Sequence, residues 1–242
     1  MTVLKQKQII LGIGAHPDDM DFTASGTVAK CIKDGGEAYY VLCTDGSRGS
    51  DDPKMTHERL ALTRRKEQLA AAKILGLTDV FFLDHPDTQL VPDLVLKEEL
   101  VRIIRTVRPT IVITMNPTFY FSTQLSPEGT HFINHTDHRA AALAAMDAVF
   151  PLSRDRLTFP EHEKEGLKPH KVSELWFTAF DQKEYVVDVT GTIEQKIKAL
   201  ACHESQFNDF PGVKKRITKR AIEFAKDEEF EFAENFIRLI MP

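Results

Sequence analysis

The chain has 242 residues, of which 28% are charged and 42% are hydrophobic, and a formal net charge of −5. This length and composition predict a single α/β domain with an adequate core. The acidic balance argues against nucleic acid or an anionic membrane as a partner, and no stretch reaches the roughly 20 apolar residues that span a bilayer. The three cysteines are widely spaced, which fits a reducing compartment. We therefore expect a soluble, cytoplasmic protein.

The first predicted element leads directly into polar residues. Residues 9–14 form a short apolar run that is rich in β-branched side chains and broken by glycines, which predicts a buried strand. The strand is followed by His16-Pro17-Asp18-Asp19. Open α/β sheets place their active sites at the carboxyl ends of such strands. A surface turn, in which the proline ends the strand and the aspartates begin a helix, explains these four residues equally well.

Strands and helices then alternate along the chain. Helices are predicted over 19–33, 56–75 (ended by Gly76), 94–107, 135–149 and 192–203, and strands over 38–43, 80–83, 111–114, 174–178 and 185–189. This alternation favours parallel strands joined by right-handed crossovers. The end of the chain alternates basic and acidic blocks. We expect one domain over 1–242 with a C-terminal helical appendage at 207–242, whose exposed aromatic residues weakly indicate a homo-oligomer.

A second polar group, His135-Thr136-Asp137-His138, lies at the start of a predicted helix. Two histidines three residues apart share one helical face, and Asp137 is placed to orient an imidazole or to stabilise the helix N-terminus. A histidine pair alone is more often structural than ligating. Together with the motif at His16, however, it offers three nitrogen or oxygen ligands and an open position, the pattern of a catalytic zinc site.

Both motifs resemble those of one family. Ala15-His16-Pro17-Asp18-Asp19 is similar to the opening signature of the LmbE-like, or PIG-L, deacetylases, and the second group is similar to their His-x-Asp-His element. Weaker matches are Arg64-x-x-Glu67, Asp87 and His203-x-Ser205-Gln206, so the resemblance covers residues 8–206. It implies a Rossmann-like three-layer sandwich with a mostly parallel sheet. It also implies zinc-dependent removal of the N-acetyl group from a small N-acetylglucosamine-containing molecule or conjugate.

The resemblance further implies a metal site and a base. His16, Asp19 and His138 would bind Zn²⁺, with Fe²⁺ as the alternative because the ligand types favour a borderline metal. Asp18 would be the general base that takes a proton from the attacking water. Spacing alone does not distinguish the ligand from the base between the two adjacent aspartates.

The remaining implied roles concern the oxyanion and the sugar. His135, held by Asp137, would stabilise the tetrahedral oxyanion or protonate the departing amine. The residues expected to contact substrate are Arg64, Asp87, Arg48 and His203. Arg64 on an exposed helix face is equally well explained as a solvated charge. The long loop over 115–134, which carries three consecutive aromatic residues, is expected to face the substrate; the alternative is a lid that packs on the body of the domain without touching substrate.

The sequence departs from the family at one position. The signature usually ends in Glu, whereas this chain has Met20, and Asp21 is the neighbouring carboxylate that could compensate. Support of a metal site by such neighbours typically matters about 10–100-fold. The five remaining histidines have no partner pattern and are expected at the surface: His57, His85, His131, His162 and His170.

Three other functions are alternatives to deacetylation. Gly12-x-Gly14 after a strand suggests dinucleotide binding, but Pro17 stands where that fingerprint needs glycine, and the paired aspartates would repel a pyrophosphate. A catalytically silent sugar- or metal-binding relative is favoured only by Met20. An amidase that acts on a sugar–thiol conjugate would use the same site.

Overall fold

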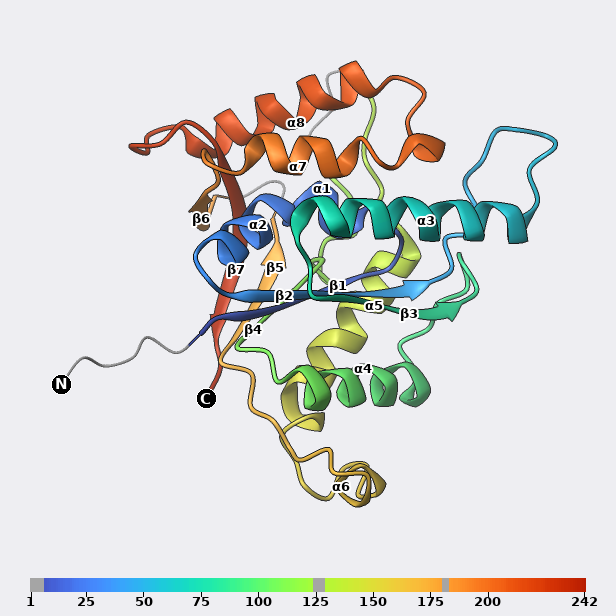
Figure 1. Ribbon diagram of the computed structural model, residues 1–242, viewed down its shortest axis with the longest axis vertical. Helices are drawn as coiled ribbons and strands as arrows, with labels where there is room; N and C mark the ends of the chain where they lie inside the picture. The colour runs from blue at the N-terminus through green and yellow to red at the C-terminus, as the bar shows by residue number, and fades with distance from the viewer. Residues whose placement is uncertain (1–6, 124–128, 180–182) are drawn as a thin grey trace.

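A computed structural model of the chain describes residues 7–123, 129–179 and 183–242. In these residues seven strands form one sheet between two layers of helices, so the predicted three-layer α/β sandwich is confirmed (Figure 1). The strands are β1 (Ile9–Gly14), β2 (Glu37–Thr44), β3 (Asp79–His85), β4 (Ile111–Thr114), β5 (Glu174–Thr178), β6 (Tyr185–Asp188) and β7 (Ala233–Ile240).

The strand order places a topological switch point beside β1. Across the sheet the order is β3-β2-β1-β4-β5-β7-β6, in which β1 to β5 are parallel and β7 runs antiparallel to both of its neighbours. The chain builds outward from β1 in one direction and then returns to β4 on its other side. The carboxyl ends of β1 and β4 therefore flank the topological switch point, where open α/β sheets bind ligands.

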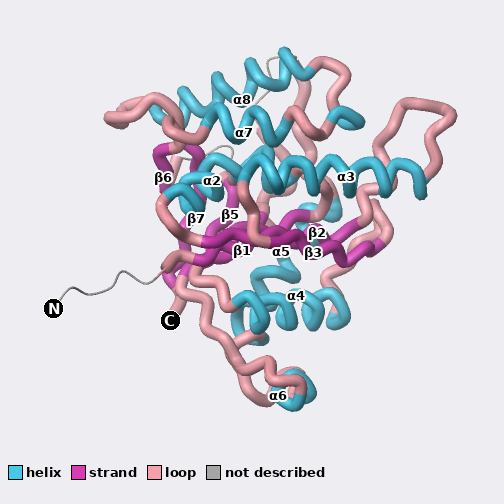
Figure 2. The backbone as a smooth tube through the Cα atoms, viewed as in Figure 1, coloured by secondary structure: helices cyan, strands magenta, loops and turns pink. Residues whose placement is uncertain are grey.

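Helices cover both faces of the sheet. They are α1 (Asp19–Thr23), α2 (Ser25–Lys33), α3 (His57–Leu75), α4 (Leu94–Val107), α5 (Thr136–Asp147), α6 (Glu161–Lys164), α7 (Ile193–Leu200) and α8 (Phe210–Ala225). Figure 2 shows α2, α3, α7 and α8 on one side of the sheet and α4 and α5 on the other. In the described part of the chain, no helix has both the length and the apolar character needed to cross a lipid bilayer.

Local sequence explains the elements that carry the site. Strand β1 is buried on both faces, and Gly12 lets Tyr40 of β2 approach closely, because a Cβ at this position would lie 2.9 Å from the Tyr40 ring. Helix α3 begins where the Thr56 side chain accepts a hydrogen bond from the backbone N–H of Arg59. It ends at Gly76, whose φ of +80° is the left-handed conformation predicted from the sequence.

Two predictions about elements were wrong. The helix expected over 19–33 is broken at Ala24, whose φ of −135° separates α1 from α2. Residues 207–242 are not a helical appendage: α8 is followed by β7, which lies between β5 and β6 inside the sheet. The strand was missed because its first half, including Glu234 and Asn235, is buried with polar side chains. A buried strand of this composition lacks the apolar pattern by which strands are found.

Candidate active site

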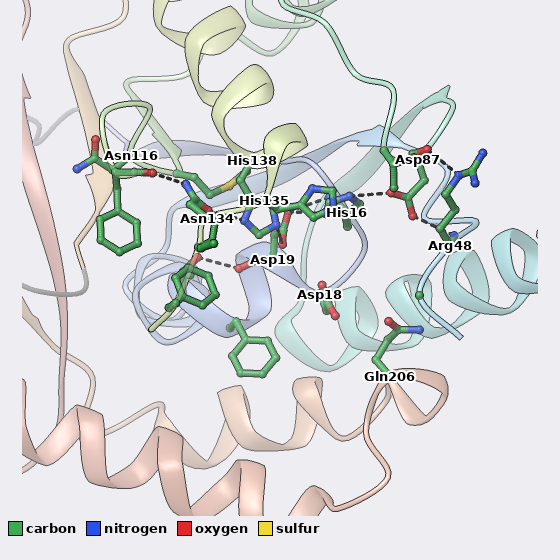
Figure 3. Close-up of a pocket in the computed structure, with 18 of the residues that line it drawn as sticks. His16, Asp18, Asp19, Arg48, Asp87, Asn116, Asn134, His135, His138 and Gln206 are labelled. Atoms are coloured by element: carbon green, nitrogen blue, oxygen red, sulfur yellow. Dashed lines mark hydrogen bonds and ion pairs between the residues drawn. The ribbon is translucent and has the colours of Figure 1, made fainter. Parts of the chain in front are cut away.

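The two sequence motifs meet at the carboxyl ends of β1 and β4. His16 follows β1 directly, and His135 caps the N-terminus of α5, the helix that follows β4 and its long loop. One ring nitrogen from each of His16, His135 and His138 lies within 4.8 Å of the others, a grouping that could hold a metal ion. Figure 3 shows these imidazoles and Asp19 converging on one region of the pocket. The structure thus brings side chains of both sequence motifs together.

Asp19 lies between two of these imidazoles. Its Oδ2 accepts hydrogen bonds from the backbone N–H groups of Ala15 and His16, both at 2.8 Å, which fixes the carboxylate. Its Oδ1 lies 3.0 Å from His138 Nε2, and its Oδ2 lies 3.7 Å from His16 Nδ1. The predicted ligand set is thus assembled around one carboxylate.

In both His16 and His138, the ring nitrogen that does not face Asp19 lies close to a different oxygen atom. His138 Nδ1 lies 3.0 Å from the side-chain oxygen of Asn134. His16 Nε2 lies 3.1 Å from Asp87 Oδ1 and 3.3 Å from Asp137 Oδ2. Metal-binding histidines have this arrangement, with one nitrogen fixed by an oxygen and the other free for the ion. Asn134, which was not among the predicted site residues, directly precedes the His135 cap of α5 and lies four residues before His138.

The region carries an excess of buried negative charge. Burial by itself would lower the pKa of His16, but hydrogen bonds to Asp137, Asp19 and Asp87 outweigh it and raise this pKa to about 12. Burial would raise the pKa of Asp19, yet His138 and His16 hold it well below its usual value. Buried carboxylates are stable when a cation pairs with them. The cluster therefore favours a bound cation.

Asp18 stands beside this cluster, on the wall of the cavity. Burial raises its pKa to about 6, with Arg64 acting in the opposite direction and Asp19 adding to the rise. Arg64 Nη2 lies 3.5 Å from Asp18 Oδ2. A carboxyl group with a raised pKa in a cleft is typical of functional sites. With a pKa near 6 it is ionised at neutral pH and still able to accept a proton.

The His135 ring is held by backbone rather than by a carboxylate. Its Nδ1 accepts a hydrogen bond of 3.1 Å from the N–H of Asp137, which in the neutral ring assigns the proton to Nε2. Burial, together with nearby His16, lowers the pKa of His135 and favours this neutral form. The Asp137 carboxylate is 4.0 Å from His135 Nδ1 but 3.3 Å from His16 Nε2. Asp137 thus contacts His135 through its main-chain N–H, whereas its carboxylate lies closer to His16.

A cavity of about 600 Å³ opens beside the cluster. Its lining includes His16, His135, His138, Asp18, Asp19 and Asp87 and, from the loop after β4, Met115, Asn116, Phe119, Phe132, Ile133 and Asn134. Phe119 and Phe132 stack with their ring centroids 6.1 Å apart and an angle of 13° between their planes. The loop predicted to face the substrate therefore lines the cavity. Its residues 124–128 lie outside the described residues.

Comparison with known proteins identifies the family. Residues 11–149 match the family PIG-L, described as GlcNAc-PI de-N-acetylase. The diacetylchitobiose deacetylase of Thermococcus kodakarensis is 34% identical over 202 residues, which is 82% of this chain and 70% of that protein. The chain belongs to the PIG-L family. It is accordingly a deacetylase, a hydrolase of amide bonds.

Further relatives agree with this assignment. A probable N-acetyl-α-D-glucosaminyl L-malate deacetylase of Bacillus anthracis is 28% identical and covers 84% of each chain. The solved structure of N,N′-diacetylchitobiose deacetylase from Pyrococcus horikoshii has a TM-score of 0.85 and 28% identity, over 98% of this chain and 85% of that one. PIG-L membership overturns the dinucleotide-binding alternative, and the LmbE-like fold is confirmed.

Three of the residues predicted to contact substrate line the cavity of this PIG-L deacetylase. Arg64 is 4% exposed and donates hydrogen bonds to the carbonyl oxygens of Pro17 at 2.7 Å and Gly46 at 3.2 Å, so it is not a solvated surface charge. Asp87 accepts from the N–H of Arg48 at 3.0 Å, and the Arg48 Nε donates to the Asp87 carbonyl. These side chains already bind protein groups, and their contact with a sugar stays a prediction.

Two histidines lie elsewhere than predicted. His203 is fully buried and does not line the cavity; its Nε2 is 2.8 Å from Asp21 Oδ2, so the prediction that it contacts substrate is wrong. His162 was expected at the surface but is also fully buried, with Nε2 3.3 Å from Glu98. Met20 is buried and packs toward Gly12, as an apolar core residue.

Proposed function

We propose that this chain is a metal-dependent deacetylase that removes the N-acetyl group from a small N-acetylglucosamine-containing molecule or conjugate. The metal would be Zn²⁺ or Fe²⁺, held by His16, Asp19 and His138. The observation that carries the proposal is the Asp19 carboxylate between two imidazoles, each fixed on its far side, next to a cavity whose wall includes Asp18. The names of the relatives supply the substrate class.

The donor set suits the metal. Two imidazoles and one carboxylate with an open position are the ligands of many catalytic zinc sites, and the same ligand types also accept iron. When bound, the ion polarises the amide carbonyl and lowers the pKa of a water molecule toward about 7. His135 offers a further nitrogen nearby. Its backbone-held Nδ1 and protonated Nε2 favour hydrogen-bond donation over ligation.

Asp18 would move the proton. Its carboxylate faces the cavity beside the ligand set, takes a proton from the attacking water, and is kept ionised by the nearby Arg64 guanidinium. As the C–N bond breaks, the same proton is available for the departing amine. The products are acetate and the free amino sugar.

His135 would stabilise the developing charge. Its Nε2–H lies at the wall of the cavity and donates a hydrogen bond to the oxygen of the tetrahedral intermediate. Protonation of the amine by His135 is the alternative role. The neutral tautomer and the lowered pKa favour oxyanion stabilisation, because a neutral imidazole is the weaker acid.

The proposal is tested by metal content and acetate release. Purified wild-type protein is supplied with Zn²⁺ or Fe²⁺, and its metal is measured by elemental analysis. Acetate release is then followed with N,N′-diacetylchitobiose, N-acetylglucosamine and N-acetylglucosaminyl conjugates of malate, inositol and a thiol-bearing group. We expect about one metal ion per chain and acetate release from at least one substrate, with no release by the Asp18→Asn variant.

Two outcomes would contradict the proposal. A wild-type protein that binds no metal lacks the basis of the mechanism. A protein that binds metal but releases no acetate from any of these compounds is a silent binding relative. Release of the carboxylic acid from the thiol conjugate alone would favour an amidase acting on sugar–thiol conjugates.

A further inference from the structure

The two weaker family-like motifs meet behind the cavity. Glu67 of α3 accepts hydrogen bonds from Ser205, from its backbone N–H at 2.8 Å and from its hydroxyl at 2.7 Å. This pair joins α3 to the turn after α7 and so fixes the position of His203 next to that turn. Neither Glu67 nor Ser205 lines the cavity. Gln68, which follows Glu67 on α3, contacts the backbone of Asp18.

The Asp18 backbone needs support. Its φ of +97° lies in a region that L residues rarely adopt, and such a conformation persists only where the surroundings hold it. Two side chains of α3, one helical turn apart, form hydrogen bonds with the backbone at Pro17 and Asp18. Arg64 donates to the Pro17 carbonyl at 2.7 Å, and the Gln68 side-chain oxygen accepts the Asp18 N–H at 3.0 Å.

A buried chain of hydrogen bonds continues behind Gln68. The Gln68 amide nitrogen donates to Asp21 Oδ2 at 2.9 Å, and His203 Nε2 lies 2.8 Å from the same oxygen. Gln68 is 1% exposed, and Asp21 and His203 are fully buried. The Asp18 N–H requires an acceptor and the Asp21 carboxylate requires a donor, so only one orientation of the Gln68 amide satisfies both. These hydrogen bonds therefore couple the position of the His203 side chain to that of the Asp18 backbone.

We propose that Gln68, Asp21 and His203 are positioning residues that hold Asp18 in the backbone conformation needed for proton transfer. None of the three lines the cavity, so they act through Asp18 and not on the substrate. Asp21, one of the three, directly follows Met20, which occupies the position where the family signature usually has Glu. The inference rests on the proposed function, because the position of Asp18 matters for rate only if Asp18 is the base.

The first test replaces Gln68 by an apolar side chain of similar length. In Gln68→Met we expect kcat to fall about 10–100-fold, with KM within about twofold and metal content unchanged. The matched control is Gln195→Met. Gln195 also donates to α3, at the carbonyl oxygens of Ile74 and Leu75, but does not line the cavity, so we expect no change in kcat.

The second test changes His203, at the other end of this series of hydrogen bonds. It decides the inference if Gln68→Met does not fold. In His203→Gln the amide nitrogen can replace Nε2 as the donor to Asp21, whereas His203→Met has no donor. We expect the glutamine variant to retain kcat within about threefold and the methionine variant to lose about 10-fold or more. If the role of His203 were purely structural, two variants of equal thermal stability would have the same kcat.

A third readout does not depend on activity. In the metal-loaded protein the Asp18 amide should exchange with solvent at least about tenfold faster in Gln68→Met than in wild type, because its acceptor is lost. If wild type releases no acetate, the proposed function fails while the exchange rate still tests the contact. If wild type is active and Gln68→Met and His203→Met keep full kcat, the positioning inference fails alone. A rise in KM, or loss of metal in either variant, also overturns it.

Discussion

Residues 9–149 and residues 150–240 contribute to the molecule in different ways. The first part forms four adjacent parallel strands and supplies every residue proposed for metal binding and proton transfer. The second part completes the sheet with β5, β6 and β7 and covers it with α7 and α8. It reaches the cavity through Gln206 and supports Asp18 through the buried His203.

The family match follows the same division, because it covers residues 11–149. The difference shows that the chemistry depends on a few side chains at strand ends, whereas the second part contributes mainly packing and buried polar contacts. Variants of the polar residues at the strand ends of the first part should therefore change activity with little change in stability. Variants in the second part should do the reverse, apart from His203.

The largest effect is expected for His138→Ala. We expect the metal content to fall from about one ion per chain to near zero and acetate release to be lost, because the variant removes one of three ligands. The measurement is elemental analysis beside the acetate assay. His57→Ala is the matched control, since His57 is exposed and contacts the Ser47 carbonyl away from the ligand set. Retention of metal at full affinity by His138→Ala would contradict the assignment.

The variant His135→Ala should show whether His135 donates a hydrogen bond to the oxyanion or binds the metal. We expect kcat to fall about 10²–10³-fold, which is the usual cost of losing an oxyanion donor, with metal content unchanged. Parallel measurements of kcat and metal decide between the two roles. Loss of metal from this variant would instead show that the three histidines form the ligand set.

The Lys196–Glu234 pair should affect stability without affecting the chemistry. Glu234 of β7 accepts from the N–H groups of Gly26 at 2.9 Å and Thr27 at 2.7 Å and pairs with Lys196 of α7, and both charged side chains are 4% exposed. Removing one partner of a buried pair costs about 3–5 kcal/mol. We expect this loss in Lys196→Met by denaturant unfolding, with kcat per folded molecule unchanged.

A double variant sharpens this prediction. Lys196→Met combined with Glu234→Gln should recover part of the loss, because no unpaired carboxylate is then buried. Strict additivity of the two single effects would argue against a direct interaction. A fall in kcat per folded molecule would show that this part of the chain does more than support the fold.

The smallest effect concerns Glu174 and Arg238, which pair across β5 and β7. The hydrogen bond from Arg238 lowers the pKa of Glu174 below its usual 4.5, against the opposing effect of burial. A depressed carboxyl pKa gives stability that is fully present above pH 4.5 and is lost as the pH falls through the folded-state value. Arg238→Gln should lower stability near pH 7 by about 0.2–1 kcal/mol.

The pH dependence of unfolding checks the last prediction. The stability difference between wild type and Arg238→Gln should shrink as the pH is lowered from 5 toward 3 (roughly the range over which carboxyl groups titrate). A difference that stays constant over this range would mean that the pair contributes nothing through the ionised Glu174.

Much of the fold was predictable because its signals are local. Runs of apolar residues predicted β1, β4 and β5, the latter two at their observed bounds, helical spacing predicted α3 and α4, and Gly76 predicted the end of α3. The two motifs predicted a shared site, since parallel strands bring their carboxyl ends to one edge of the sheet. The ligand and base assignments rest on a resemblance, because spacing does not reveal which of two adjacent aspartates faces an ion.

By itself, the sequence determined the order of the first six strands and of the long helices between them, and the two groups of polar residues at strand ends. Only the tertiary structure decided that β7 enters the sheet and that the Asp137 carboxylate contacts His16 rather than His135. It also decided that His203, 182 residues from Asp21 in the chain, supports Asp18 from behind. The physical reason is range: hydrophobic periodicity and capping act over a few residues, whereas a buried polar side chain is partnered by whatever the fold brings to it.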